Sequence, residues 1–181
     1  MTSYVALLRA VNVGGTGKLP MTDLKALCEQ CGFAKVKTFI ASGNVVFHSA
    51  KSAAQVKHAL EEALHDYAGK PVGVHIRTAS EMAAVLAANP FPEAPGNRTV
   101  AIFLDEPPPA DTLEKTTGVR DEQLSLGLRE VYVLYGQGMA DSKLKIPCAK
   151  TGTARNMNTV AKLTEMARAL NAQRGSTSAM G

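Results

Sequence analysis

The order in which short apolar runs and helical patterns alternate limits this chain to few folds. Residues 4–13 form a short apolar run bounded by glycines, which is typical of a buried strand. A helical pattern follows, and two extended runs around residues 42–43 then predict a hairpin. Ser52 and Gln55 predict the start of a second helix, and residues 71–77 predict a further strand. The first half thus has the β-α-β-β-α-β order of the ferredoxin-like motif.

The second half repeats this order less clearly. A helix with a capping box at Thr78 and Glu81 comes first. The pattern then predicts a strand over residues 99–104, a weak helix over 111–116 and a hairpin formed by 123–126 and 130–135. A short helix over 142–148 and a longer helix from Asn158 onward complete the prediction. The order is β-α-β-β-α, followed by an additional helix.

We therefore predict an α+β protein of duplicated ferredoxin-like (β-α-β-β-α-β) halves packed into one compact body. The duplication is inferred from element order alone, because no residue-level repeat is visible. Residues 1–170 are predicted to form a single compact domain made of two pseudo-repeats, 1–78 and 79–170. The small, polar segment 171–181 is predicted to be a disordered tail.

Composition places the chain among ordinary globular proteins, with 45% hydrophobic and 20% charged residues in a length of 181. No apolar run approaches the ~20 residues that span a bilayer. The first residues lack the basic flank and cleavage site of a signal peptide, so a cytoplasmic location is expected. Three cysteines are too few for a disulfide scaffold. Cys28 and Cys31 fall at the end of a predicted helix, so we expect inert thiols, and no cofactor or metal site is predicted.

Positive charge is concentrated in the C-terminal quarter. Between Lys143 and Arg174 there are seven basic residues and one acid, Glu165, in a chain whose net charge is +4. Such an excess attracts anionic partners, although a solvated, lysine-rich helix face would look the same. Sequence-tolerant binding of a nucleic-acid backbone is therefore one alternative. Base stacking is a poor fit, because only 5% of the residues are aromatic.

Two polar segments offer hydrogen-bond donors to an anion. Residues 151–159 combine one arginine, two asparagines and three threonines just before a helical pattern, where the backbone favours negative charge. Residues 12–18 follow the first strand, but Asn12 and Leu19 replace the glycine and the hydroxyl of a phosphate loop. A nucleotide triphosphatase is not predicted. The segment keeps only the general capacity of a glycine-rich loop to hold an anion by its N–H groups.

These observations predict a small anionic ligand, phosphate or carboxylate, in a cleft between the two halves. The candidate ligand-binding residues are Arg9, Asn12, Lys18, Ser142, Lys143, Arg155, Asn156 and Asn158. Arg155 is the preferred anchor, because a guanidinium binds an oxyanion with two parallel hydrogen bonds. Alternatively, Arg9 and Arg155 bond backbone carbonyls and join the halves, and the asparagines cap helices. A further alternative is an enzyme of unknown reaction in the same cleft, with Lys143 or Ser142 as nucleophile, but no general base is visible beside them.

Several stretches resemble one bacterial family, and they occur in that family's order. They are residues 8–15 with 18–21, residues 42–47, residues 142–144, and residues 153–156 with 158–159. The family is that of domain of unknown function 1697, and the resemblance extends from Tyr4 to about Leu170. It implies two interlocked ferredoxin-like subdomains, and it implies no activity, cofactor or substrate. Family members usually have tryptophan where this chain has Met157, so any stacking by that ring is lost here.

Overall fold

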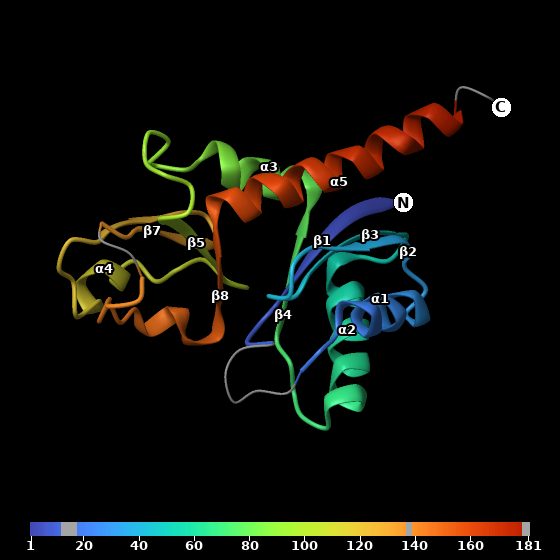
Figure 1. Ribbon diagram of the computed structural model, residues 1–181, viewed down its shortest axis with the longest axis horizontal. Helices are drawn as coiled ribbons and strands as arrows, with labels where there is room; N and C mark the ends of the chain where they lie inside the picture. The colour runs from blue at the N-terminus through green and yellow to red at the C-terminus, as the bar shows by residue number, and fades with distance from the viewer. Residues whose placement is uncertain (12–17, 137–138, 179–181) are drawn as a thin grey trace. The chain divides into compact units, whose positions relative to one another are not determined.

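The computed structural model describes residues 1–11, 18–136 and 139–178, of which 173–178 are described by their backbone alone. The chain divides into two compact units (Figure 1). The first unit comprises Met1–Ala83 and Lys162–Gly181, and the second comprises Ala84–Ala161. Two helices, α3 (Ala79–Ala87) and α5 (Met157–Ser178), contribute residues to both units.

The first unit contains an antiparallel sheet with two helices on one face (Figure 1). Its elements in chain order are β1 (Thr2–Leu8), α1 (Met21–Gln30), β2 (Ala34–Thr38), β3 (Asn44–Ser49), α2 (Ala53–Ala68) and β4 (Val74–Thr78). The strands lie in the order β2-β3-β1-β4, and all neighbours are antiparallel. β1 is therefore a central strand, and the chain leaves it between β3 and β4.

Alternation along β1 divides its side chains between the two faces of the sheet. Tyr4, Ala6 and Leu8 belong to the apolar cluster that includes Leu24 of α1 and Leu60 of α2. All five side chains are buried. This cluster is the core of the first unit, and it fixes both helices on the same face of the sheet.

The ends of α2 are defined by local signals. Ser52 Oγ accepts the N–H of Gln55, and Gln55 Oε1 accepts the N–H of Ser52, which completes the predicted capping box. At the other end Gly69 adopts a φ of 71°, the left-handed conformation that commonly terminates helices. The chain turns there, and Lys70 begins the connection to β4.

The face of the first sheet opposite α1 and α2 carries buried polar and charged groups. His48, His75 and Arg77 are 4%, 3% and 1% exposed. The guanidinium of Arg77 donates to the carbonyl oxygen of the preceding residue at 3.0 Å. Ser3 Oγ donates to Asn171 Oδ1 at 2.6 Å, which joins β1 to the distal part of α5. These two hydrogen bonds offset part of the cost of burying the Arg77 guanidinium and the Ser3 hydroxyl.

The second unit contains another antiparallel sheet of four strands. Its elements are β5 (Thr99–Phe103), α4 (Thr112–Lys115), β6 (Gln123–Leu126), β7 (Glu130–Leu134), the 3₁₀ helix η1 (Pro147–Thr151) and β8 (Thr153–Asn156). The strand order is β6-β7-β5-β8, which matches the order in the first unit. Val100, Ile102 and Val131 pack with Ile146 and Cys148 on one face of this sheet. The protein is thus α+β with two four-stranded antiparallel sheets, an arrangement compatible with two similar halves.

Several predicted elements are confirmed. The two predicted hairpins are present as β2–β3 and β6–β7. The second predicted capping box is formed by Thr78 and Glu81, which exchange hydrogen bonds of 2.9 and 3.1 Å at the start of α3. The three cysteines are free thiols, and Cys28 lies buried near the end of α1.

The helix predicted over residues 142–148 is wrong. Lys145 and Thr117 exchange two backbone hydrogen bonds of 2.8 and 3.0 Å, which holds this part of the chain extended. Helical structure begins only at Pro147, as η1. A partner distant in sequence has therefore overridden the local helical pattern.

Two boundaries and one additional strand also differ from the sequence prediction. The first strand ends at Leu8, and Ala10 has a φ of 55°, which is incompatible with a strand. β8 was not predicted, because Thr-Ala-Arg-Asn is short and polar. The helix α5 extends to Ser178, well into the predicted tail of residues 171–181.

Among the described residues, no helix has both the length and the apolar character needed to cross a bilayer.

Candidate functional site

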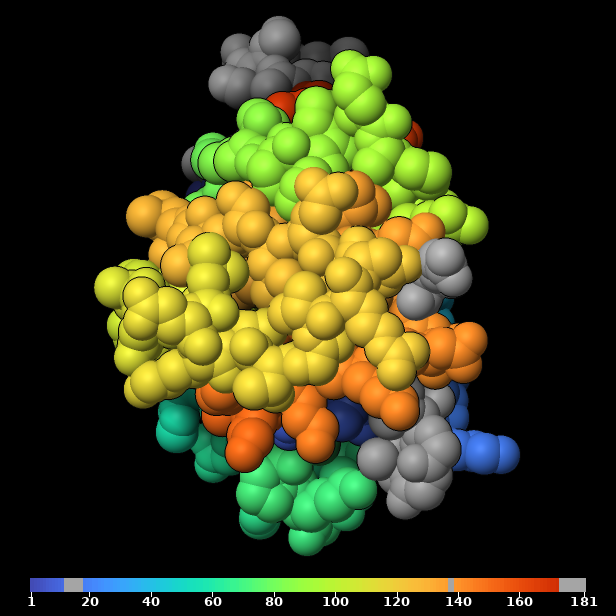
Figure 2. Space-filling view, turned by 90° about the vertical axis from the view of Figure 1, so that its left-hand side faces the viewer, coloured from blue at the N-terminus to red at the C-terminus, as the bar shows by residue number. Residues whose placement is uncertain are grey.

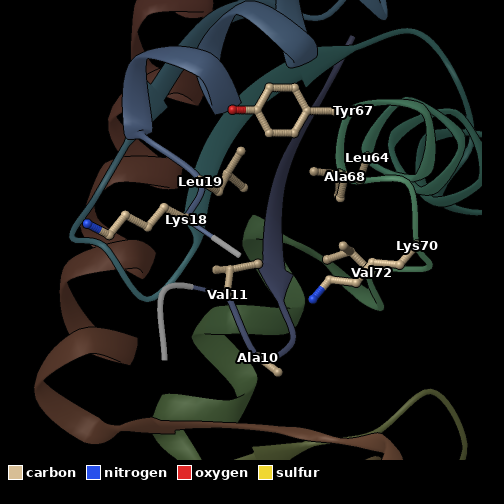
Figure 3. Close-up of a pocket in the computed structure, with 9 residues that line it drawn as sticks. All are labelled: Ala10, Val11, Lys18, Leu19, Leu64, Tyr67, Ala68, Lys70 and Val72. Atoms are coloured by element: carbon tan, nitrogen blue, oxygen red, sulfur yellow. The ribbon is translucent and has the colours of Figure 1, made fainter. Parts of the chain in front are cut away.

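The first unit contains a pocket of about 310 Å³ where the chain leaves β1 (Figure 3). The residues that line it are Ala10, Val11, Lys18, Leu19, Leu64, Tyr67, Ala68, Lys70 and Val72. This volume is at the lower end of the range for small-molecule sites. All of these described lining residues belong to the first unit.

Three segments that are distant in sequence form the pocket. Ala10 and Val11 follow β1, and Lys18 and Leu19 come just before α1. The last turns of α2 and the connection to β4 supply the remaining residues. The packing of α1 and α2 on the sheet therefore determines the shape of the pocket.

The charges around the pocket have one sign. Among the described residues that line it, Lys18 and Lys70 are cationic and none is acidic. Both lysines are exposed, and the remaining walls are mainly apolar. In Figure 3 the Lys70 side chain extends toward Val11, whereas the Lys18 amine points away from the other residues shown. Lys70 is therefore the cation that enters the pocket, and Lys18 is a cation at its rim.

Tyr67 forms an aromatic wall that is held in place from outside the pocket. Its hydroxyl donates to Asp23 Oδ2 at 2.6 Å, which joins α2 to the first turn of α1. This hydrogen bond to a carboxylate raises the pKa of Tyr67 above its ordinary value. The phenol therefore stays protonated at neutral pH, and its proton is already donated to Asp23.

The other predicted residues of the first unit lie outside the pocket lining. Arg9 is exposed, and its backbone N–H donates to the carbonyl oxygen of Gly73 at 2.9 Å. A Cβ atom at Gly73 would lie 3.5 Å from Arg9 Cβ, so the arginine stem lies against that glycine. Asn12 lies outside the described residues, as does most of the glycine-rich segment 12–18.

Ser142 and Lys143 lie in the second unit and play different parts. Ser142 Oγ donates to Glu122 Oε1 at 2.6 Å and accepts the N–H of Leu144 at 3.3 Å. The hydroxyl, together with a backbone N–H of Arg120, holds the pKa of Glu122 below its usual range. The Lys143 side chain is exposed. A carboxylate with a lowered pKa is a weak proton acceptor, so this pair ties two loops together more readily than it activates a nucleophile.

Arg155 is a buried residue of β8, with 7% of its surface exposed. Its guanidinium donates to Thr153 Oγ1 at 2.6 Å and to the carbonyl oxygen of Ala154 at 2.9 Å. Burial lowers the pKa of Arg155 to about 10, which still leaves it charged at neutral pH. These contacts agree with the alternative in which Arg155 bonds backbone and neighbouring groups.

Asn156 is the last residue of β8, directly before α5, and Asn158 is the second residue of α5. Asn156 Oδ1 accepts the N–H of Thr159 at 2.9 Å, which caps the helix. The amide of Asn158 lies against Gly96, where an added Cβ would collide with it. The backbone N–H of Met157 donates to the carbonyl oxygen of Gly96 at 3.1 Å. These groups bind the loop before β5 to the start of α5.

The basic C-terminal quarter is divided between the two units. Lys143, Lys145 and Lys150 are exposed in the second unit, and the orange segment that carries them reaches the surface in Figure 2. Lys162 belongs to the first unit and forms a surface ion pair of 3.6 Å with Glu165. A single helix face therefore does not carry this charge.

Other parts of the described structure are poorer candidates for a functional site. Within the parts of the chain that the structure describes, no group of three His, Cys, Asp or Glu side chains could hold a metal ion. A second cavity of about 380 Å³ is lined in part by His58, Glu61 and Glu62. Glu61 pairs with Lys57, and Glu62 lies 3.6 Å from His58. These carboxylates already have partners, so this cavity is a poorer candidate.

Sequence reasoning identified one of the two lysines of the pocket. Lys18 was predicted as a ligand-binding residue, and it lines the pocket. Lys70 and Tyr67 were missed, because their contribution depends on how α2 packs on the sheet. The available signal was Gly69-Lys70-Pro71, a helix stop that places a lysine directly at the end of α2.

Comparisons with known proteins identify relatives without an assigned activity. The sequence model of the family described as "Protein of unknown function (DUF1697)" matches residues 1–132. That match includes the resembling stretches near residues 8–21 and 42–47 and ends before those beyond residue 140. The solved structure of the conserved bacterial protein SP0830 from Streptococcus pneumoniae is 26% identical, with a TM-score of 0.75, and the similarity covers 92% of this chain and 98% of that one. No curated protein matches this chain significantly.

Proposed function

The chain belongs to the family described as "Protein of unknown function (DUF1697)", and we propose its function from the pocket of the first unit. We propose that this pocket binds a small anionic ligand beside Lys18 and Lys70. The observation that supports this proposal is the one-sided charge of the pocket. Its described lining contains two lysines and no acid. An anion in the pocket is attracted by the Lys70 amine and, at the rim, by the Lys18 amine, and no acidic side chain of the described lining repels it.

The proposal is narrower than the prediction from sequence, because it needs only the first unit. Ser142, Lys143, Arg155, Asn156 and Asn158 are not part of the proposed site. Their contacts within the second unit support a structural role for Arg155 and Asn156 in particular. The ligand is therefore expected to bind without them.

Charge-removing variants test the proposal. We would titrate the wild-type protein calorimetrically with inorganic phosphate, acetate and octanoate at low salt, and repeat the titration with Lys18→Met, Lys70→Met and the double variant. Methionine keeps much of the lysine stem and removes its charge. Lys25→Met is the matched control, because Lys25 is an exposed lysine of α1 in the same unit but does not line the pocket.

We expect at least one of these anions to bind the wild-type protein and Lys25→Met equally well. Removal of an amine that contacts the anion should weaken binding about tenfold, or about 1.4 kcal/mol. Binding should also weaken as salt is added, because the lysines are exposed. The proposal is wrong if none of the three anions binds, or if the double variant binds as tightly as Lys25→Met.

We also propose that the two units are duplicated ferredoxin-like halves. The shared strand order supports this. In addition, each sheet has a buried arginine near the end of its last strand, Arg77 in β4 and Arg155 in β8. Each donates to the carbonyl oxygen of its preceding residue, and each is followed directly by a helix-capping residue, Thr78 or Asn156. An alignment of the units on these two arginines, with coincident strands, is the expected result, and a register offset would contradict it.

A further inference from the structure

The walls of the pocket indicate more about its ligand than its charge does. Most lining side chains are hydrocarbon: Val11, Leu19, Leu64, Ala68 and Val72. Lys70 is the cation that extends among them (Figure 3). A ligand that carried polar groups throughout would leave those groups without partners against these walls, which is unfavourable. A ligand with an apolar body and one anionic end places no polar group against the apolar walls, and its anionic end can pair with Lys70.

Among the described residues, the donors near the pocket suit a carboxylate better than a phosphate. Phosphate sites usually use several backbone N–H groups at the start of a helix. At the start of α1, Pro20 has no N–H, and its carbonyl oxygen already accepts the N–H of Asp23 at 3.0 Å. The Asp23 carboxylate also occupies the first turn of α1. α2 presents its C-terminal end to the pocket, which carries partial negative charge. These negative charges therefore disfavour a doubly charged phosphate more strongly than a singly charged carboxylate.

Tyr67 does not add a donor for the ligand. Its hydroxyl already donates to Asp23 Oδ2 at 2.6 Å. The ring remains available as a flat apolar wall beside Leu64 and Ala68 of the same helix. The phenol thus contributes surface for a hydrocarbon body and no additional attraction for phosphate oxygens.

The size of the cavity limits the size of the ligand. A volume of about 310 Å³ holds roughly ten water-sized groups at about 30 Å³ each. We propose that the ligand is an amphipathic monocarboxylate of roughly ten non-hydrogen atoms, such as a medium-chain fatty acid, with its hydrocarbon body against the apolar wall and its carboxylate at Lys70. This inference rests on the proposed anion binding and specifies the ligand class for the same pocket.

A chain-length series tests the inference. We would measure the affinity of the wild-type protein for acetate, butanoate, hexanoate, octanoate and dodecanoate, and for inorganic phosphate, by calorimetry below the critical micelle concentrations. Affinity should rise about fourfold for each added methylene group and level off near octanoate, when the cavity is full. Phosphate should bind much more weakly than octanoate. Octylamine is the control for charge, because it has a similar body and the opposite sign, and it should not bind.

A pocket-filling variant tests where the hydrocarbon body lies. Ala68 is exposed and lines the pocket at the end of α2, so Ala68→Phe fills the cavity without disturbing the core. We expect this variant to bind octanoate at least tenfold more weakly and to bind acetate as the wild type does. Ala26→Phe is the matched control, because Ala26 is an exposed residue of α1 outside the pocket lining.

The outcomes separate this inference from the proposed function. If phosphate binds in a manner that depends on Lys70 and octanoate binds no more tightly, the inference is overturned and the proposed function stands. If octylamine binds as well as octanoate, or if Ala68→Phe leaves octanoate binding unchanged, the inference is also overturned. If no anion binds, both are wrong.

Discussion

Gly43→Ala tests how closely the turn before β3 packs against Leu8 and Val11. Gly43 has a φ of 88°, and an added Cβ would lie 2.5 Å from Val11 Cγ2 and 2.9 Å from Leu8 Cβ. Gly32 provides a matched control, because its φ is 87° and an added Cβ would have nothing within 4 Å. A left-handed conformation costs any L-residue roughly 1–2 kcal/mol, and that cost is common to both variants. The difference between them therefore isolates the collision.

The collision at Gly43 should be expensive, because Leu8 Cβ is attached to the backbone of a central strand and cannot move far. Overpacking of this kind costs roughly 1–3 kcal/mol. We expect Gly32→Ala to lower the free energy of unfolding by about 1–2 kcal/mol and Gly43→Ala by about 2–5 kcal/mol. Urea denaturation followed by far-UV circular dichroism measures both, and both glycines belong to the first unit. Equal losses of stability in the two variants would refute the reasoning.

Three further predictions concern individual side chains. Burial raises the pKa of Cys28 to about 12. Iodoacetamide at pH 8 should therefore leave Cys28 unlabelled in the folded protein while it labels half-buried Cys148. Mass spectrometry that finds equal labelling of the two cysteines would contradict this. The Ser142 hydroxyl lowers the pKa of Glu122, so the stability that this carboxylate contributes is present above its unfolded pKa and is lost as pH falls through the lower folded value. Ser142→Ala should therefore shift the acid-unfolding midpoint to higher pH, and an unchanged midpoint would show that the bond contributes nothing. Lys70→Met should lower the free energy of unfolding by about 0.3–1 kcal/mol, because a positive charge just beyond the end of α2 is favourable; thermal denaturation that shows a gain in stability would exclude this.

Local signals allowed most of the fold to be predicted. Ser52 and Gln55 carry the complete information for the start of α2, because both hydrogen bonds of the capping box lie within four residues. The continuous apolar run that includes most of β1 likewise predicts a buried strand from the sequence alone. Elements of this kind are determined by neighbours in the chain, and a pattern detects them.

Elements determined by distant partners were not predicted. Lys145 is extended because its backbone bonds that of Thr117, and no local pattern records that partner. β8 is short and polar, and it is a strand because it pairs with β5, as Arg155 does with Ala101. Tertiary pairing has overridden local propensity in both places.

The candidate site was only partly predictable for the same reason. Lys18 was found because it follows the first strand in sequence. Lys70 and Tyr67 come together with it through the packing of α2 on the sheet, which element order does not specify. Glu122, the partner of Ser142, is 20 residues away along the chain, so no spacing rule could have paired them.

A nuclear magnetic resonance titration of the ¹⁵N-labelled protein with octanoate tests the central claim most directly. We predict saturable shifts of the backbone amides of Val11, Leu19, Leu64 and Ala68, which line the pocket, and loss of those shifts in Lys70→Met. Amides around Arg155 in the second unit should remain unchanged. Shifts that cluster around Arg155 while those four amides stay still would contradict the claim.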